Sequence, residues 1–440
     1  MVTDASGQRL SLGLVLMVMK RSHHVALKPT AEQEVLFGQH AGYARFAYNW
    51  TLGEFRAGLE VGEWLSERTL RLRWNVVKSM IAPWGSELSQ NAAKYAIIDF
   101  GQAAEVWGEY RRKMKDGQRP GRRVGFPRYK RRKHEQGFRA DNGPDTVRVD
   151  GRVIILPKIG PIAMVERLRF SGSIREVTVN RTAGTWFACF CVEDGEEPPP
   201  VKDGPTVGVD VGVGTMATCS DGTTAENPKA LSSALKRLRH VDKAIALSRN
   251  VHGKSNHSNR RERLYARRRR LHARVVNARI DHNHKATTAI AKSAGRVVVE
   301  TLNVAGMMLN RRLARSIADA GMSGFLTKLE YKCLWYGAEF VKADRWFASS
   351  KVCSSCGWKN DGLSLCDREW WCGSCGVLNE RDVNAARNLE QWPGLSFPVS
   401  GRGDRVRPAM LAVVGEASSG SGPEVWTPAS LEYQISSGSK

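Results

Sequence analysis

Two Cys-x-x-Cys pairs constrain this chain more than any other feature of its sequence. Cys353 and Cys356 form the first pair, Cys372 and Cys375 form the second, and fifteen residues separate Cys356 from Cys372. Each pair presents two thiolates on one side of a tight turn, and four thiolates complete the tetrahedral coordination of zinc. Because four protein ligands leave no open position, the pattern predicts a structural Zn²⁺ site. Cys366, between the pairs, is not expected to be a ligand.

The cysteine count and the chain length restrict the class of protein. Four of the nine cysteines belong to one zinc-like pattern in a chain of 440 residues, so a reducing cytoplasm is expected rather than a disulfide framework. This length suits two or three domains. The apolar run Leu10–Met19 is too short to span a bilayer and lacks clear signal-peptide features, so it is predicted to be a buried strand, with no membrane partner.

Positive charge is in large excess. The chain has 67 Lys and Arg against 44 Asp and Glu, a net charge of +23, which favours a polyanionic partner such as nucleic acid. Residues 111–139 mix this charge with Phe126, Tyr129 and Phe138, whose rings can stack on bases, although a solvated loop is the alternative. The candidate nucleic-acid contacts are Arg122, Arg123, Arg128, Tyr129, Lys130, Arg131, Arg132, Lys133, Arg267, Arg268 and Arg381.

The first half of the chain has the pattern of a strand, a helical block and hairpins. A strand over residues 12–28 is followed by a helix that Thr30 caps, with Gln33 closing a capping box. Helical spacing continues over 64–80 and 89–113. From Thr146 the period changes to two, which predicts hairpins that turn at Asp150-Gly151 and near Arg181–Gly184. These strands together suggest a small β-barrel.

After a linker at 193–205, the second half indicates buried strands and long helices. A strand precedes Asp210, a helical hairpin covers residues 229–294 with a break near 251–259, and a second buried strand covers Arg296–Glu300. Residues 396–440 are rich in Gly, Ser and Pro without periodicity, and they are predicted to be a poorly ordered tail.

Three acidic residues stand at the ends of these elements. Asp210 lies in VGVDVGVG, Glu300 ends RVVVE, and Asp382 lies in NERDVNAARNL, where a helix begins. An acid buried at the end of an apolar strand is costly unless it is paired or binds a metal. Together the three predict an oxygen cage for Mg²⁺ or Mn²⁺, in which two ions activate water and stabilise the leaving oxygen of a phosphodiester.

The ordered motifs VGVDVGVG, RVVVETLNVAGM, CSSCGWKN, WWCGSCG and NERDVNAARNL resemble the TnpB proteins of transposons over about residues 20–392. Those proteins are compact RNA-guided DNA nucleases related to type V CRISPR effectors. The resemblance implies an α/β and α+β multidomain chain: an RNase H-like RuvC nuclease domain with an inserted zinc ribbon, preceded by a β-barrel wedge domain with an inserted helical recognition domain. Implied boundaries are 1–30 and 126–200 for the wedge domain, 31–125 for the recognition domain, 206–350 and 377–395 for the RuvC domain, 351–376 for the zinc ribbon and 396–440 for the tail.

The resemblance also implies the activity. Asp210, Glu300 and Asp382 match the family's catalytic acids and would bind two Mg²⁺, and the four paired cysteines match its zinc ribbon. A structured guide RNA would direct cleavage of complementary DNA beside a short adjacent motif. The partners are therefore guide RNA and target DNA, a monomer is favoured, and the place of action is the bacterial cytoplasm and its nucleoid.

Four other functions are considered at this stage, of which a transposase that joins strands itself is disfavoured because the sequence has no HUH motif or tyrosine recombinase pattern. A miniature type V CRISPR effector would use the same chemistry with a CRISPR RNA, and only the bound RNA or the genomic neighbourhood separates the two. A non-cleaving RNA-guided repressor would be favoured by loss of an acid, and all three acids remain. A plain zinc-ribbon DNA-binding module would leave the two strand-end acids unexplained.

Overall fold

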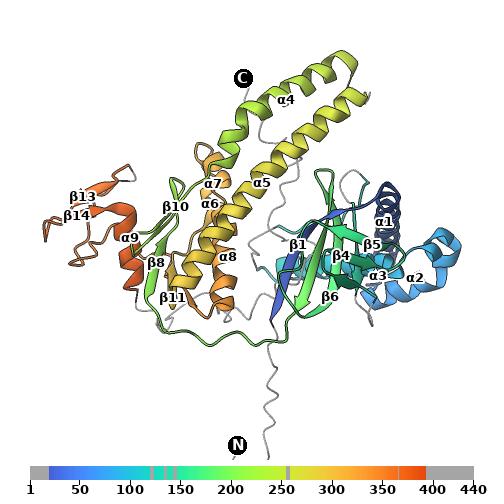
Figure 1. Cartoon of the computed structure of the whole chain (residues 1–440), viewed down its shortest axis with the longest axis horizontal. Coiled ribbons are helices and arrows are strands. Elements are labelled where there is room, and N and C mark those ends of the chain that lie inside the picture. Colours follow the sequence, from blue (N-terminus) through green and yellow to red (C-terminus); the bar gives the residue numbers. More distant parts are fainter. Residues whose placement is uncertain are drawn as a thin grey trace, which may run out of the picture. The chain divides into compact units, whose positions relative to one another are not determined.

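The computed structural model describes residues 19–118, 123–132, 136–141, 146–253, 258–364 and 366–392. The chain divides into two units, and the division between Glu197 and Pro198 falls in the segment that its composition indicates as a linker (Figure 1). The expectations for residues 1–18 and for the tail 396–440 concern residues outside the described part. Within the described part, no helix is long and apolar enough to cross a membrane.

The first unit combines a helical block with an antiparallel sheet. The strand order in this sheet is β2-β6-β7-β1-β5-β4-β3. Its elements are β1 (Lys20–Lys28), α1 (Ala31–Glu60), α2 (Glu67–Ile81), a 3₁₀ helix (Pro83–Glu87), α3 (Gln90–Lys115), β2 (Gly137–Asp141), β3 (Arg148–Asp150), β4 (Val153–Leu156), β5 (Gly160–Met164), β6 (Ser173–Thr182) and β7 (Thr185–Glu193).

Local chemistry determines where several of these elements begin and turn. The predicted capping box of α1 is confirmed, because the Thr30 hydroxyl accepts from the Gln33 amide and the Gln33 side chain accepts from the Thr30 amide. The hairpin β3–β4 turns at Gly151, whose φ of +56° suits a residue without a side chain. The hairpin β6–β7 turns at Ala183-Gly184, as predicted.

The expected closed barrel is not confirmed. Among the described residues no pairing joins β2 to β3, so the seven-stranded sheet has two edges. The helical block packs against the β2 edge: Asp141 accepts hydrogen bonds from Asn91 and Lys94 of α3. Phe138 of β2 is buried against Phe37 of α1, with ring centroids 6.0 Å apart. The base stacking expected of Phe138 is therefore wrong, because this ring belongs to the core.

The second unit is built on a mixed sheet with the order β10-β9-β8-β11-β12. β8, β11 and β12 are parallel, whereas β9 and β10 run antiparallel to their neighbours. Its elements are β8 (Thr206–Asp210), β9 (Thr215–Cys219), β10 (Thr224–Glu226), α4 (Ala230–His252), α5 (Asn259–Ser293), β11 (Arg296–Val299), α6 (Val304–Met307), α7 (Ala314–Ala320), α8 (Met322–Trp335), β12 (Glu339–Lys342), β13 (Glu369–Trp371), β14 (Leu378–Glu380) and α9 (Arg381–Glu390).

Helices cover this sheet on both faces. Because side chains alternate along a strand, Val207 and Val209 of β8 point into one core, which also holds Phe325 and Leu329 of α8. Gly208 points to the other face, which α9 covers. A Cβ atom at Gly208 would collide with the carbonyl oxygen of Ala386 and the backbone nitrogen of Glu390, so α9 lies directly on the backbone of β8.

The predicted helical hairpin is confirmed as α4 and α5. Arg261, near the start of α5, is fully buried. Its guanidinium donates to the Ser248 hydroxyl, the Ser248 carbonyl and the Gly253 carbonyl, and these bonds hold the end of α4 to the start of α5. A buried charge that is satisfied in this way has a structural role.

Gly208→Ala is expected to push α9 away from the sheet and to destabilise the second unit by about 1–3 kcal/mol. Thermal or urea denaturation measures this change. Gly214→Ala is the matched control, since nothing lies within 4 Å of a Cβ at that position. Equal stability of both variants and the unaltered chain would contradict the close packing of α9 on β8.

Candidate functional site

The first two acids lie at the carboxyl ends of neighbouring parallel strands. Asp210 is the last residue of β8, and Glu300 follows Val299, the last residue of β11. The register pairs Val209 with Val299, so the next positions, Asp210 and Glu300, fall side by side. Neighbouring strands are about 4.8 Å apart, and both side chains are half-buried.

The third acid comes from α9. Asp382 lies in the first turn of this helix, where the positive end of the helix dipole favours a carboxylate. One turn later, Ala385 and Ala386 are buried where the helix meets β8 and its neighbours. The close approach at Gly208 therefore determines where Asp382 stands. We call Asp210, Glu300 and Asp382 the acid cluster.

Electrostatics indicate that the three acids act on one another. Burial, together with the charges of Glu300 and Asp382, raises the pKa of Asp210 to about 8, although Arg381 opposes the shift. Converging carboxylates of this kind are stabilised by a cation, and hard oxygen donors fit Mg²⁺ or Mn²⁺. Among the described residues, only the four paired cysteines form a group of three or more possible metal ligands whose ligand atoms all lie within 4.8 Å of one another. The carboxylate oxygens of the acid cluster are not that close together.

Two further side chains hold the acids, and the sequence did not indicate either. The Ser349 hydroxyl donates to the carboxylate of Glu300. Arg368 lies 3.5 Å from the carboxylate of Asp382, measured from guanidinium nitrogen to oxygen. Both partners lie between β12 and α9 in the chain, so the segment that contains the cysteines also contacts the acid cluster.

Two buried amides join α9 to the start of that segment. Asn384 donates to the Val352 carbonyl at 2.7 Å and accepts from the Ser354 amide at 2.8 Å. Asn388, one turn later, donates to the carbonyls of Ser349 and Val352 at 2.7 and 2.6 Å. Their spacing of four residues places both side chains on one face of α9. In the sequence, this spacing was the available indication that the two amides act together.

The four paired cysteines come together as expected. Their sulfur atoms all lie within 4.8 Å of one another, with Cys353 and Cys372 buried and Cys356 and Cys375 exposed. We call residues 351–380, which include β13 and β14, the cysteine ribbon. Burial raises the pKa of Cys353, but the amides of Ser355 and Cys356 and the Asn379 side chain outweigh burial and lower it to about 6. Four thiol groups at this spacing fit a tetrahedral Zn²⁺.

The candidate nucleic-acid contacts differ in how exposed they are. Arg123, Arg128, Arg131, Arg132 and Arg267 are exposed, whereas Lys130 and Arg381 are half-buried. Two of the predicted residues, Arg122 and Lys133, lie outside the described part of the chain.

Several of these candidates already have intramolecular partners, and the Lys130 ammonium lies 4.4 Å from the centroid of the Tyr48 ring. Tyr129 is 48% exposed, with the Arg56 guanidinium 5.1 Å from its ring centroid. Arg268 pairs with Asp242 at 2.8 Å and is only 11% exposed, so its charge is used within the α4–α5 hairpin.

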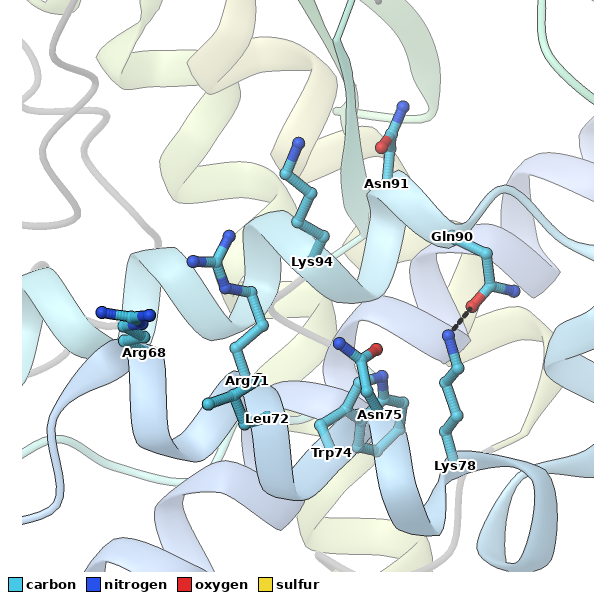
Figure 2. A pocket seen from close by; sticks show the side chains of 9 residues that line it. All are labelled: Arg68, Arg71, Leu72, Trp74, Asn75, Lys78, Gln90, Asn91 and Lys94. Atoms are coloured by element: carbon cyan, nitrogen blue, oxygen red, sulfur yellow. Dashed lines mark hydrogen bonds between the residues drawn. The ribbon is translucent and has the colours of Figure 1, made fainter.

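A pocket of about 310 Å³ lies between α2 and α3 in the first unit. Figure 2 shows its lining and the hydrogen bond from Lys78 to Gln90, which measures 3.2 Å. Lys94 pairs with Asp141, and Arg71 pairs with Glu67. The lining residues are Arg68, Arg71, Leu72, Trp74, Asn75, Lys78, Gln90, Asn91 and Lys94.

Three family models match this chain. Residues 189–311 match a model described as "Probable transposase", and residues 323–389 match "Cas12f1-like, TNB domain". Residues 17–58 match a model described as a helix-turn-helix domain. The described part of that last range forms the strand β1 and the single helix α1, not two helices joined by a turn.

Several curated relatives match most of the chain, under names that begin "Putative RNA-guided DNA endonuclease". A protein of Mycobacterium tuberculosis H37Rv is 34% identical over 424 residues, which cover 85% of this chain and 87% of the relative. A protein of Streptomyces pristinaespiralis is 32% identical, covering 90% and 94%. InsQ of Escherichia coli K12 is 27% identical, covering 82% and 90%.

Solved structures match more weakly. The Cas12f1 chain of a complex with guide RNA and target DNA has a TM-score of 0.29 at 17% identity, covering 86% of this chain and 100% of that one. The mini-RNA-guided endonuclease CRISPR-Cas_phi3 has a TM-score of 0.42 at 9% identity, covering 88% and 94%. Scores this low do not establish a shared arrangement of the whole chain.

Cys372→Ser is expected to remove most of the bound zinc and to lower the melting temperature, because a structural site contributes its binding energy to folding. Metal analysis of the purified chain, together with thermal denaturation, measures both effects. Cys366→Ser is the control, since this exposed thiol lies outside the quartet. If Cys372→Ser kept its zinc and melted like the unaltered chain, the quartet would not be a zinc site.

Proposed function

We propose that this chain, which belongs to the TnpB family of transposon-encoded proteins, is an RNA-guided DNA endonuclease that cuts DNA at the acid cluster. The observation that carries the proposal is the convergence of Asp210, Glu300 and Asp382 from two parallel strands and one helix. The names of the relatives suggest the substrate, and the acid cluster supplies groups that can cleave a phosphodiester. The sheet order β10-β9-β8-β11-β12 supports an RNase H-like RuvC domain.

The three carboxylates would hold the two Mg²⁺ that the proposed reaction requires. Bound Mg²⁺ would lower the pKa of the attacking water and stabilise charge on the scissile phosphate. Water adds to the phosphorus, and the 3′ oxygen leaves. Ser349 keeps the Glu300 carboxylate oriented, and Arg381 places positive charge beside Asp210.

Sequence specificity in this proposal comes from base pairing between the guide RNA and one DNA strand. The protein then needs to recognise mainly the backbone and shape of the paired strands. The net charge of +23 suits this role, because Lys and Arg that neutralise phosphates release condensed counterions. Exposed arginines of the first unit, such as Arg128 and Arg131, are candidates for these contacts.

The pocket between α2 and α3 is our candidate for the site that reads the short adjacent motif. Among the described residues, Arg68 and Asn75 line it without a recorded partner of their own. A guanidinium suits a phosphate, whereas an amide can make two hydrogen bonds to the edge of an adenine. The amide of Gln90 is already used by Lys78 and the Gly85 carbonyl, so Asn75 is the better candidate for base contact.

Asp210→Ala is expected to abolish guided DNA cleavage while leaving RNA binding intact, because only the acid cluster loses a ligand. Cleavage of a plasmid that carries the guide-matched target measures the first effect, and sequencing of the RNA that copurifies measures the second. Glu330→Ala is the control, since this acid forms an exposed pair with Lys342 on the same unit. Retained cutting by Asp210→Ala would overturn the assignment of the site.

The RNA from the same purification tests the guide. A single abundant species that ends in sequence from outside the transposon supports the proposed function. A repeat-spacer species would instead make the chain a miniature CRISPR effector. RNA of no defined sequence would overturn the guided mechanism.

Arg68→Ala and Asn75→Ala are expected to affect DNA binding in different ways. Arg68→Ala would lose a phosphate contact and weaken binding to all flanking sequences alike. Asn75→Ala would lose a base contact, which costs about 1–3 kcal/mol of binding free energy on the preferred motif alone. Cleavage of a library with randomised flanking bases measures both. If Asn75→Ala kept the full preference for the motif, the pocket would not be its reader.

A further inference from the structure

The loop between β12 and the cysteine ribbon is bonded at its start to the two neighbours of Glu300 and at its end to Glu300 itself. At its start, the Ala343 amide donates to the Val299 carbonyl at 2.8 Å, and the Thr301 hydroxyl donates to the Ala343 carbonyl at 2.7 Å. At its end, the Ser349 hydroxyl donates to Glu300. The position of this loop is therefore fixed relative to the acid cluster.

Two neighbouring aromatic residues of this loop have different environments. The Phe347 ring packs against Trp392, with centroids 4.6 Å apart. Trp346 is 82% exposed, and its backbone amide donates to the Asp344 carboxylate at 2.7 Å. Because Phe347 and the backbone bonds already hold the loop, packing does not account for the indole of Trp346.

A cation accompanies the exposed ring. The Arg345 guanidinium carbon lies 5.2 Å from the centroid of Trp346. An exposed indole with an arginine beside it can stack on a base and meet the adjoining phosphate. Ser349 lies three positions after Trp346, a span of at most about 11 Å, which about three stacked nucleotides cover.

We propose that Trp346, with Arg345, is a stacking platform for a base of the single-stranded DNA that lies at the acid cluster. This inference rests on the proposed function, because the strand to be cut must pass the acids beside which the loop is anchored. The platform would hold the strand a few nucleotides from the scissile phosphate. It would do so without base preference, since every base has a face that can stack.

Exposure alone does not support such a role, because single exposed apolar residues are common. Leu309 is also 82% exposed, but it has no π face, and among the described residues it makes no hydrogen bond to the acid cluster. Trp371 is 69% exposed on β13, but within the described part of the chain no arginine lies over its ring. Trp346 combines exposure, a stacked cation and attachment to Glu300.

Binding of short single-stranded DNA to the full chain tests the platform. The probes are a labelled oligonucleotide and a matched one whose bases have been removed, and both are measured in the Asp210→Ala background to prevent cutting. Trp346→Ala is expected to weaken binding of the base-bearing probe about tenfold and to leave the abasic probe unchanged. Trp346→Phe should retain most of the preference for bases, and Leu309→Ala is the control that should bind both probes normally.

Either of two results would overturn the inference: full base preference in Trp346→Ala, or an equal loss for both probes. A loss confined to a matched RNA probe would also overturn it, because the platform would then serve RNA. A different result would overturn the proposed function but not the platform. In that case the unaltered chain would fail to cut guided DNA, while the preference for bases would still depend on Trp346.

Discussion

The contact between α9 and the bare backbone of β8 at Gly208 determines the geometry of the second unit. Any side chain at this position would strike Ala386 and Glu390, so the helix approaches only because the residue is glycine. That approach brings Asp382 to the strand that ends in Asp210. The third acid is distant in sequence from the first, and this backbone contact places the two in one electrostatic environment.

The same helix explains why a cysteine ribbon stands directly before an acid. Asn384 and Asn388 bond to backbone groups at the start of the ribbon, while Arg381 bonds through its amide to the Arg368 carbonyl at the ribbon's far side. Zinc binding in the ribbon would order these backbone groups, since a structural site contributes to folding. The ribbon therefore supports the position of α9 and contacts Asp382 through Arg368, while Ser349, in the loop just before the ribbon, contacts Glu300.

The sequence predicts features whose cause is local and misses those that depend on packing. The capping box at Thr30, the turn at Gly151 and the two cysteine pairs were all predicted from the sequence. Each of these features is encoded by residues that lie only a few positions apart. The convergence of Asp210 with Glu300 was predictable from the ends of two apolar runs. The roles of Ser349, Asn384 and Asn388 depend on a helix and a loop meeting, and the four-residue spacing of the two asparagines shows only that they share a helix face. Phe138 was misjudged for the same reason: its basic neighbours in sequence do not indicate that α1 covers its ring.

The positive charge of this chain would give it affinity for nucleic acid, but charge alone would not select a target sequence. Contacts from Lys and Arg to phosphates bind any sequence, so a net charge of +23 cannot by itself choose a cutting site. Part of that charge is used internally, since Arg261 is buried in hydrogen bonds and Arg268 is paired with Asp242. A base contact, such as the one proposed for Asn75, would add direct readout to these phosphate contacts. A guide RNA, as in the proposed function, would supply the sequence information that phosphate contacts do not carry.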